Sequence, residues 1–177
     1  MSASTSDPAT RSAERGSGVV TILEDGVLSG ILGAAVVAAF FLLLDFVRGE
    51  PLHTPSLLGS VLFLGKSVEE VTTVSAMIVF AYTGLHVLVF MFAGAILAWM
   101  VSQFEANPQF GMVLLLIFLL FEAVLFGFEV TVVPSLVGEL GAWAVGLANL
   151  LSAVVMFGYL LRRHPEAMSR LRQGIAE

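Results

Sequence analysis

The sequence predicts an all-α fold, a bundle of four transmembrane helices with a short interfacial or re-entrant segment between the first and the second. The first observation is composition: 58% of the 177 residues are hydrophobic and only 12% are charged, whereas roughly 25% are charged in soluble domains. The second is that Asp, Glu, Lys and Arg are absent from four long stretches, residues 26–44, 71–104, 106–121 and 140–161. A helix of about 20 apolar residues crosses a bilayer, so four crossings are expected.

The chain begins with a polar segment. Residues 1–20 are rich in Ser, Thr, Ala and Gly and lack the apolar core of a signal peptide, so we expect a disordered cytoplasmic tail. Thr21 and Glu24 have the spacing of a capping box, in which two side chains satisfy free amides at a helix start. The first helix is therefore predicted over residues 22–47, at the beginning of a transmembrane domain over residues 21–164.

A short apolar segment separates the first two long helices. Residues 56–65 are apolar but reach only about half the length of a span, so they are expected to lie in the interface or to re-enter the membrane. Ser67 and Glu70 form a second capping-box pattern, which predicts a helix over residues 68–104. At 1.5 Å per residue this helix is about 55 Å long, which requires tilt, a kink or a projection out of the bilayer.

Residues typical of helix starts and helix ends delimit the last two predicted helices. Asn107 and Pro108 are a typical helix opening, so the third helix is predicted over residues 108–133, passing through Glu122 and Glu129. The fourth is predicted over residues 139–163, where two arginines suit a helix C-terminus. Residues 165–177 are expected to form an amphipathic cytoplasmic tail.

Basic residues predict the orientation, because Lys and Arg concentrate on the cytoplasmic side. Only two of them fall on the side opposite to the two termini, Arg48 and Lys66. The others are Arg11, Arg15, Arg162, Arg163, Arg170 and Arg172. We therefore expect a multi-pass protein of the cell (inner) membrane with both termini in the cytoplasm.

Small residues predict how the helices pack. The first helix carries Gly26, Gly30, Ala34 and Ala38 at four-residue steps, and small residues let helices approach closely in lipid. The same stripe could pack within the bundle or between two copies of the chain. The partners expected are thus the lipid bilayer and either a homo-oligomer or a larger membrane complex.

Polar residues inside the apolar stretches are the candidate functional residues. His86 and Glu122 each lie roughly 17 Å deep, and a charge near the midplane costs about 2.5–3.5 kcal/mol, so such residues turn inward and find partners. We predict that Glu122 meets His86, either as a neutral pair, which a dry interior favours, or as an ion pair. Further polar residues that could extend this pair into a proton or ion path are Tyr82, Thr83, Glu129 and Asn149.

Three interpretations of the Glu122–His86 pair stay open. It could be a polar contact that fixes the register of two helices, or a proton relay, ion site or ligand contact. In the third interpretation the pair does not form and each residue is satisfied elsewhere.

Several kinds of functional site are excluded because the sequence lacks the residues or motifs that they need. Without cysteine there is no disulfide, thiolate metal site or cysteine nucleophile, and without a basic run nucleic acid is not an expected partner. No zincin, phosphate-loop or nucleophile-elbow motif occurs. We therefore expect neither a catalytic residue nor a metal or cofactor.

Two segments, "LLLDFVRGEPLHTPSLLG" and "ANLLSAVVMFGYLLRRHPE", resemble patterns in small bacterial four-helix membrane proteins of unassigned function. This resemblance implies no activity. The sequence favours a non-enzymatic integral membrane protein, an accessory or structural component that acts alone or within a larger membrane complex. The alternatives are a small proton- or cation-coupled transporter or channel and, third, a haem- or quinone-binding redox subunit.

Overall fold

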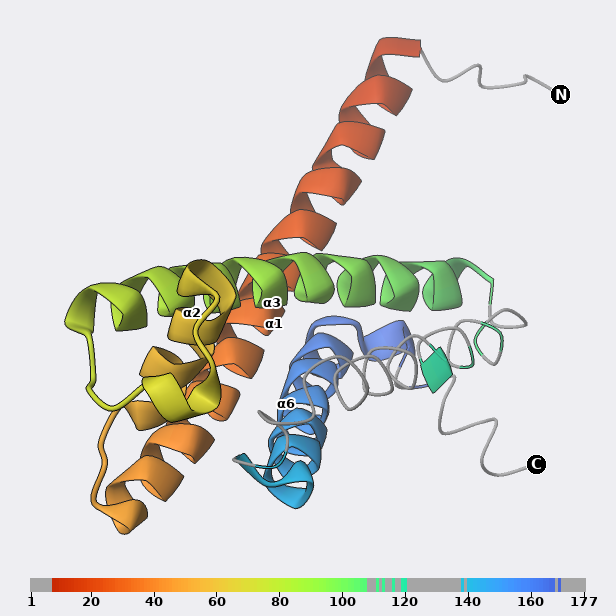
Figure 1. The fold of residues 1–177 in the computed structure, drawn as a ribbon. Helices are drawn as coiled ribbons and strands as arrows, with labels where there is room; N and C mark the ends of the chain where they lie inside the picture. The colour runs from red at the N-terminus through yellow and green to blue at the C-terminus, as the bar shows by residue number, and fades with distance from the viewer. Residues whose placement is uncertain are drawn as a thin grey trace, which may run out of the picture.

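The structure, a computed structural model, is all-helical, with no strand among the residues that it describes (Figure 1). These are residues 8–107, 111, 113, 116, 119, 120, 138, 140–167 and 169, with side chains described from residue 19 onward. The elements are α1 (Pro8–Arg48), α2 (His53–Leu64), the 3₁₀ turn η1 (Val68–Glu70), α3 (Ala76–Ala106) and α6 (Ala142–Arg163).

Three of these helices are long and apolar enough to cross a membrane: Val19–Arg48 within α1, Ala76–Ala106 and Ala142–Arg163. The all-α prediction is thus confirmed, together with three of the four predicted spans as candidates. The predicted helix over residues 108–133 falls mostly outside the described residues.

The first helix starts earlier than the capping-box pattern predicts. α1 begins at Pro8 and so includes much of the segment expected to be a disordered tail. Proline suits the first position of a helix, where its missing N–H would have no partner. Thr21 and Glu24 consequently lie inside α1, and they do not start the helix.

The second capping box is present but caps a different element. Ser67 and Glu70 make both reciprocal contacts, with the Ser67 N–H donating to Glu70 Oε2 at 3.0 Å, yet they cap η1. The chain then leaves helical geometry until α3 begins at Ala76. The interrupted segment includes Val71, Thr72 and Thr73, whose β-branched side chains have a slightly lower helix propensity.

The apolar segment after α1 forms a helix, α2, that is tied to both neighbours. Leu57 is fully buried, and α2 packs mainly on the N-terminal part of α3. The Ser75 N–H, just before α3, donates to Ser56 Oγ at 3.1 Å. A Cβ at Gly59 would lie 2.5 Å from Ile78 Cγ2, so this glycine permits the close contact with α3.

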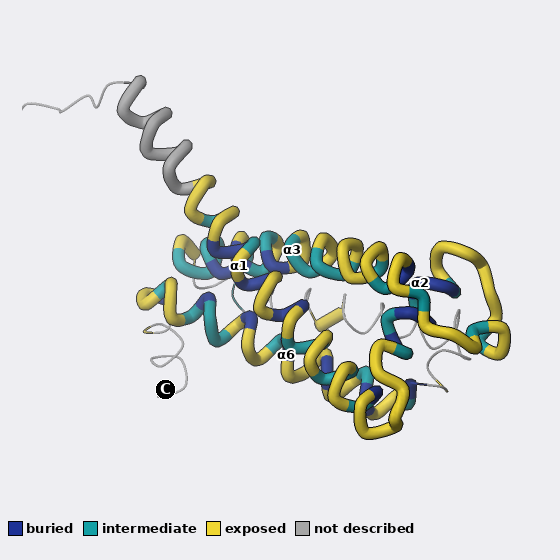
Figure 2. Tube along the Cα trace, turned by 90° about the vertical axis from the view of Figure 1, so that its left-hand side faces the viewer, coloured by how far each residue is buried: buried dark blue, intermediate teal, exposed yellow. Residues whose placement is uncertain are grey.

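α1 is the central helix, because it packs against both α3 and α6 (Figure 2). A Cβ at Gly26 would lie 2.5 Å from the Cα of Ala95, and one at Gly30 would lie 2.6 Å from the Cα of Met91. Toward α6, the Ser29 hydroxyl donates to the Met156 carbonyl at 3.3 Å. α1 therefore holds α3 at backbone-to-backbone distance and contacts α6 through a side-chain hydrogen bond.

α3 and α6 meet chiefly at one end. Ala98 and Val101 of α3 form a buried cluster with Leu160 of α6 and Ala167. Away from this cluster the two helices separate, so that the N-terminal part of α6 lies far from α3 (Figures 1 and 2).

Candidate functional site

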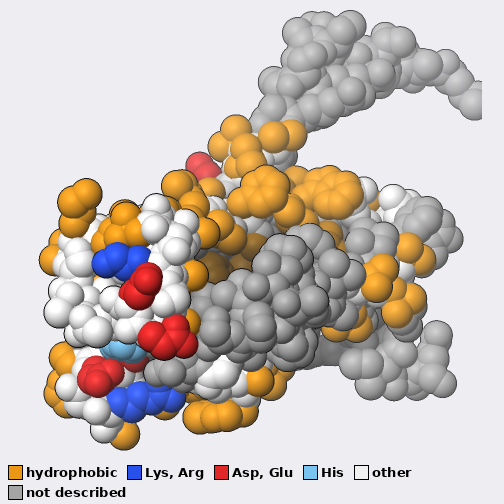
Figure 3. Space-filling view, in the orientation of Figure 1, with side chains coloured by type: hydrophobic (Ala, Val, Ile, Leu, Met, Phe, Trp, Pro, Cys, Tyr) orange, Lys and Arg blue, Asp and Glu red, His pale blue; other side chains and the backbone are white. Residues whose placement is uncertain are grey.

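Apart from His86, the described acidic, basic and histidine side chains gather toward the two ends of the long helices. One group joins the start of the α1 span to the ends of α3 and α6, and we call it the carboxylate–histidine cluster: Asp25, Glu105, Arg163 and His164. The other lies where α1 meets α2, around Asp45. Figure 3 shows charged side chains collected at the α2 end, next to a largely apolar surface.

His164 is the centre of the first cluster. Its Nδ1 lies 2.9 Å from Glu105 Oε2, while its Nε2 lies 3.6 Å from Asp25 Oδ2. Nε2 is buried and has no hydrogen-bond partner among the described residues. Since a carboxylate only accepts hydrogen bonds and a neutral imidazole has one N–H, the ring can donate to one acid when neutral and reach toward both when protonated.

Asp25 is held by a second cation. Arg163 Nε donates to Asp25 Oδ1 at 2.8 Å, and Asp25 is only 2% exposed, whereas the Arg163 side chain is 54% exposed. Glu105 also accepts a bond from the Ala167 N–H at 3.3 Å. The cluster therefore fastens three helices at one level and places a buried acid next to a solvent-accessible guanidinium.

The sequence analysis missed this cluster because its members are far apart in the chain and each has a local explanation. Arg163 suits a helix C-terminus, and His164 precedes a helix-stopping proline. The sequence did offer one sign of this cluster. Asp25 directly follows Glu24 at the start of the first span, and an acid in that position needs a partner.

The second cluster is a buried carboxylate at a helix start. Asp45 Oδ2 accepts from the Thr54 N–H at 2.8 Å, and Asp45 Oδ1 accepts from the Thr54 hydroxyl at 2.6 Å. Nearby, Glu50 and His53 lie 3.5 Å apart and line a shallow groove of about 440 Å³ with Thr72 and Thr73.

His86 contacts α1 directly. Its Nε2 lies 3.3 Å from the Ala34 carbonyl oxygen, and because a carbonyl can only accept, Nε2 carries the proton of this bond. The ring stacks on Tyr82 with centroids 6.0 Å apart and meets Phe90 at 4.7 Å. These contacts place His86 between α1 and its own helix.

The predicted partners of His86 are not all described. Glu122 and Glu129 lie outside the described residues, so the Glu122–His86 pair stays a prediction. Tyr82 is half-buried, whereas Thr83 and Asn149 are exposed.

Only part of the predicted small-residue stripe is buried. Gly26, Gly30 and Ala34 are buried, and Ala38 is exposed. Gly26, Gly30 and the Ala34 carbonyl oxygen all contact α3.

No group of three or more His, Asp or Glu side chains within the described part of the chain is arranged to hold a metal ion. The chain matches no family model, and neither a curated protein nor a solved structure is detectably similar to it.

Proposed function

We propose that the protein is a non-enzymatic integral membrane protein that acts as an accessory or structural component of a larger membrane complex. The proposal rests on one observation, that the buried polar side chains bond to neighbouring helices. Asp25, Asp45 and Ser29 each bond to a neighbouring element. Groups engaged in this way hold helices together, so they are not free to bind a substrate.

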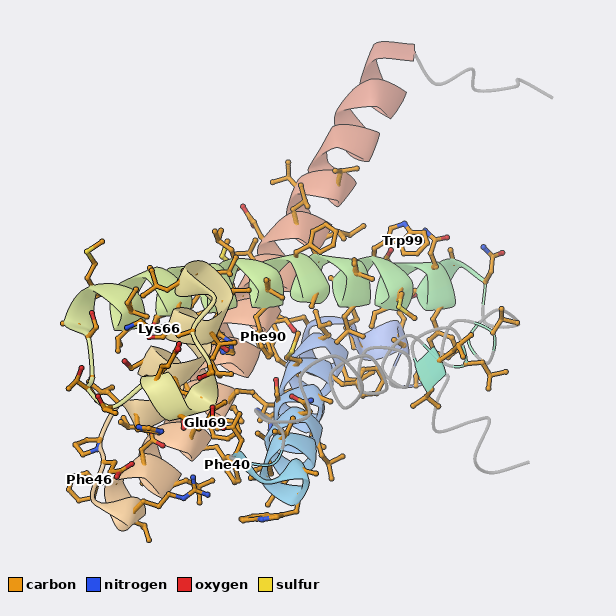
Figure 4. All side chains as sticks on the ribbon, viewed as in Figure 1. Phe40, Phe46, Lys66, Glu69, Phe90 and Trp99 are labelled. Atoms are coloured by element: carbon orange, nitrogen blue, oxygen red, sulfur yellow. The ribbon has the colours of Figure 1, made fainter. Side chains whose placement is uncertain are left out.

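The surface supports insertion in a bilayer. Large apolar side chains are exposed along all three candidate spans, among them Leu43, Phe80 and Val154. Phe46 and Trp99 point away from the neighbouring helices (Figure 4) and are 74% and 51% exposed. In water this would be an unusually large apolar patch, whereas in lipid it is the expected outer surface.

A fourth crossing by residues 108–133 completes this proposal. The contact between Glu105 and His164 joins the end of α3 to the end of α6, and α6 begins about 33 Å away at its other end. The chain between α3 and α6 therefore has to return across the same thickness, and its predicted helix is long enough to do so. α2 then lies in the interface or re-enters from that side.

We also propose that both termini are cytoplasmic, in the inner membrane of a bacterium. The carboxylate–histidine cluster supports a common side for the beginning of the α1 span and the end of α6. Six of the eight basic residues belong to the terminal segments on that side, as the positive-inside rule requires.

A transport function is the second candidate, a proton- or cation-coupled transporter or channel with His86 and Glu122 as the exchange site. The observation that favours it is the half-buried imidazole in the middle of α3, stacked on Tyr82. An ionisable group at that depth is a usual component of proton paths.

Proton flux in liposomes separates the two functions. We expect the purified protein to give no more flux than protein-free liposomes, and we expect His86→Ala and Glu122→Gln to leave that level unchanged. Flux that both variants abolish while retaining helical content and thermal stability would overturn the accessory role and support transport.

A further inference from the structure

The carboxylate–histidine cluster contains one ring nitrogen whose hydrogen bonding is incomplete. The His164 side chain is 13% exposed, and its Nε2 is buried without a hydrogen-bond partner among the described residues. Asp25 Oδ2 lies 3.6 Å from this nitrogen, which is close enough for an ion pair but slightly too far for a hydrogen bond. Such an atom calls for an explanation, because buried polar groups nearly always have a partner.

A neutral imidazole does not satisfy both acids. It has one N–H and one lone pair, whereas Glu105 Oε2 lies 2.9 Å from Nδ1 and Asp25 Oδ2 is the acid oxygen next to Nε2. If Nδ1 carries the proton, the lone pair of Nε2 faces the Asp25 carboxylate. If Nε2 carries it, the lone pair of Nδ1 faces Glu105. Each neutral tautomer therefore leaves two acceptors facing each other in a largely buried place.

A protonated imidazole fits the same position. Both of its nitrogens donate, so one ring can bind Glu105 and, after a small shift, Asp25. The charges then balance, because the two carboxylates meet the Arg163 guanidinium and the imidazolium. Without the second ring proton the cluster carries one negative charge in excess, and a buried charge with incomplete compensation is destabilising.

Charged and titratable groups from all three helices surround this ring. The described ones besides Asp25, Glu105 and Arg163 are Glu24 and Tyr159, which interact electrostatically with Arg163, and the exposed Arg162 and Glu166. Arginine stays protonated in proteins, whereas histidine is the side chain that ordinarily changes charge between about pH 5 and 8. The ring is thus the member of the cluster suited to respond to pH near neutrality.

The charge of this ring bears on helix packing, because the ring joins three helix ends. Asp25 directly precedes Gly26, at which α1 is in backbone contact with α3. Glu105 is the last residue but one of α3, and His164 is the C-cap of α6. Since α3 and α6 meet chiefly at this end, the bond between Glu105 and His164 is a principal polar link between them.

We propose that His164 makes this cluster a pH-sensitive switch. The protonated ring holds the end of α6 against α1 and α3, and loss of its second proton as the pH rises loosens that end. The direction follows from linkage, because the closed arrangement binds the proton that the loosened one releases. The switch adds a regulatory property to the structural role, and it involves only described helices, so it does not depend on whether residues 108–133 cross the membrane.

A distance measurement on the full-length protein in nanodiscs tests the switch. Spin labels can be placed specifically at Leu23→Cys and Glu166→Cys, because the natural chain has no cysteine and both positions are exposed. We expect one narrow distance distribution at about pH 5.5 and a longer or broader one at about pH 8.

Two histidine variants of the labelled protein show which residue responds. His164→Gln cannot take up a charge and should give the same distribution at both pH values. His53→Gln is the matched control, because His53 also lies next to an acid, Glu50, but at the α2 end. It should retain the full pH response.

NMR of the histidine rings provides a second measurement, which holds even if His164→Gln does not fold. The chain has three histidines, so His53→Gln and His86→Gln assign the remaining ring signals to His164. We expect the His164 ring to lose its second proton over the same pH range in which the label distance changes.

Three results would overturn the proposal. A label distance that is the same at both pH values would show that the cluster is a fixed contact. A pH response that persists in His164→Gln would assign the response to another group. A His164 ring that loses its proton with no change in the label distance would show that its charge does not control the packing.

Discussion

The carboxylate of Asp45 in α1 binds Thr54 in α2 through two hydrogen bonds, from the Thr54 backbone N–H and from its hydroxyl. Both residues are almost completely buried. The residue before α2, Leu52, provides no side-chain cap, so a carboxylate from the preceding helix takes over that role at the positive end of the α2 dipole. One acid thereby sets where α2 begins and fixes it to α1.

We expect Asp45→Ala to lower the free energy of unfolding by about 2 kcal/mol, because a hydrogen bond to a charged group contributes roughly 1.5–3 kcal/mol and two are lost here. Thr54→Val should cost less, since the backbone N–H still donates. Unfolding in mixed micelles measures both variants. Glu50→Gln, at a side chain that is 63% exposed, is the control and should change little; an equal loss in all three would contradict the capping role.

Gly30 should tolerate no side chain. In Gly30→Ala the new Cβ would collide with the carbonyl oxygen of Phe90 and the Cα of Met91, and backbone atoms cannot move aside without separating α1 from α3. We expect a loss of about 1–3 kcal/mol, the usual cost of overpacking. Gly84→Ala is the matched control, because a Cβ there meets nothing within 4 Å among the described residues.

Thermal unfolding in detergent compares the stability of Gly30→Ala with that of Gly84→Ala. A Gly30→Ala protein as stable as Gly84→Ala would show that α1 and α3 do not approach as closely as the structure indicates.

Leu52→Gly should stabilise the protein. Leu52 has a φ of 66°, a left-handed conformation that costs a residue with a Cβ roughly 1–3 kcal/mol, and it is 42% exposed, so little burial is lost. Part of the gain is offset by the greater freedom of glycine in the unfolded chain. We expect a higher melting temperature, with Gly65→Ala, at a φ of 64°, moving it in the opposite direction; a lower melting temperature for Leu52→Gly would contradict the backbone strain.

The carboxylate–histidine cluster predicts an asymmetry between neighbouring arginines. Arg163→Gln removes the cation from Asp25, whose charge is then buried with weaker compensation, so we expect a clear loss of stability. Arg162→Gln changes an exposed residue and is the control.

A double-mutant cycle completes this test. Asp25→Asn together with Arg163→Gln should cost less than the sum of the two single changes, because the pair is coupled. Additive effects would show that Arg163 and Asp25 act independently.

Local patterns predicted much of the fold but misplaced helix boundaries. The capping contacts of Ser67 and Glu70 form as the pattern indicates, but the chain leaves helical geometry after η1, and α3 starts only at Ala76. Thr21 and Glu24 match the same pattern inside an uninterrupted α1. A capping box is a local arrangement, and whether a long helix begins there depends on the residues on both sides.

By itself, the sequence determined that the chain is helical and contains long apolar helices. Long stretches without charged residues indicate a lipid environment, and in lipid the backbone N–H and C=O groups of such a stretch find their partners within a helix. Only the tertiary structure decided which polar residues meet. Asp25, Glu105 and His164 are brought to one level by the packing of three helices, and His86 is directed to the Ala34 carbonyl by the close approach that Gly26 and Gly30 permit. Such contacts depend on the register between helices, which is set by shape complementarity over many residues and not by any local motif.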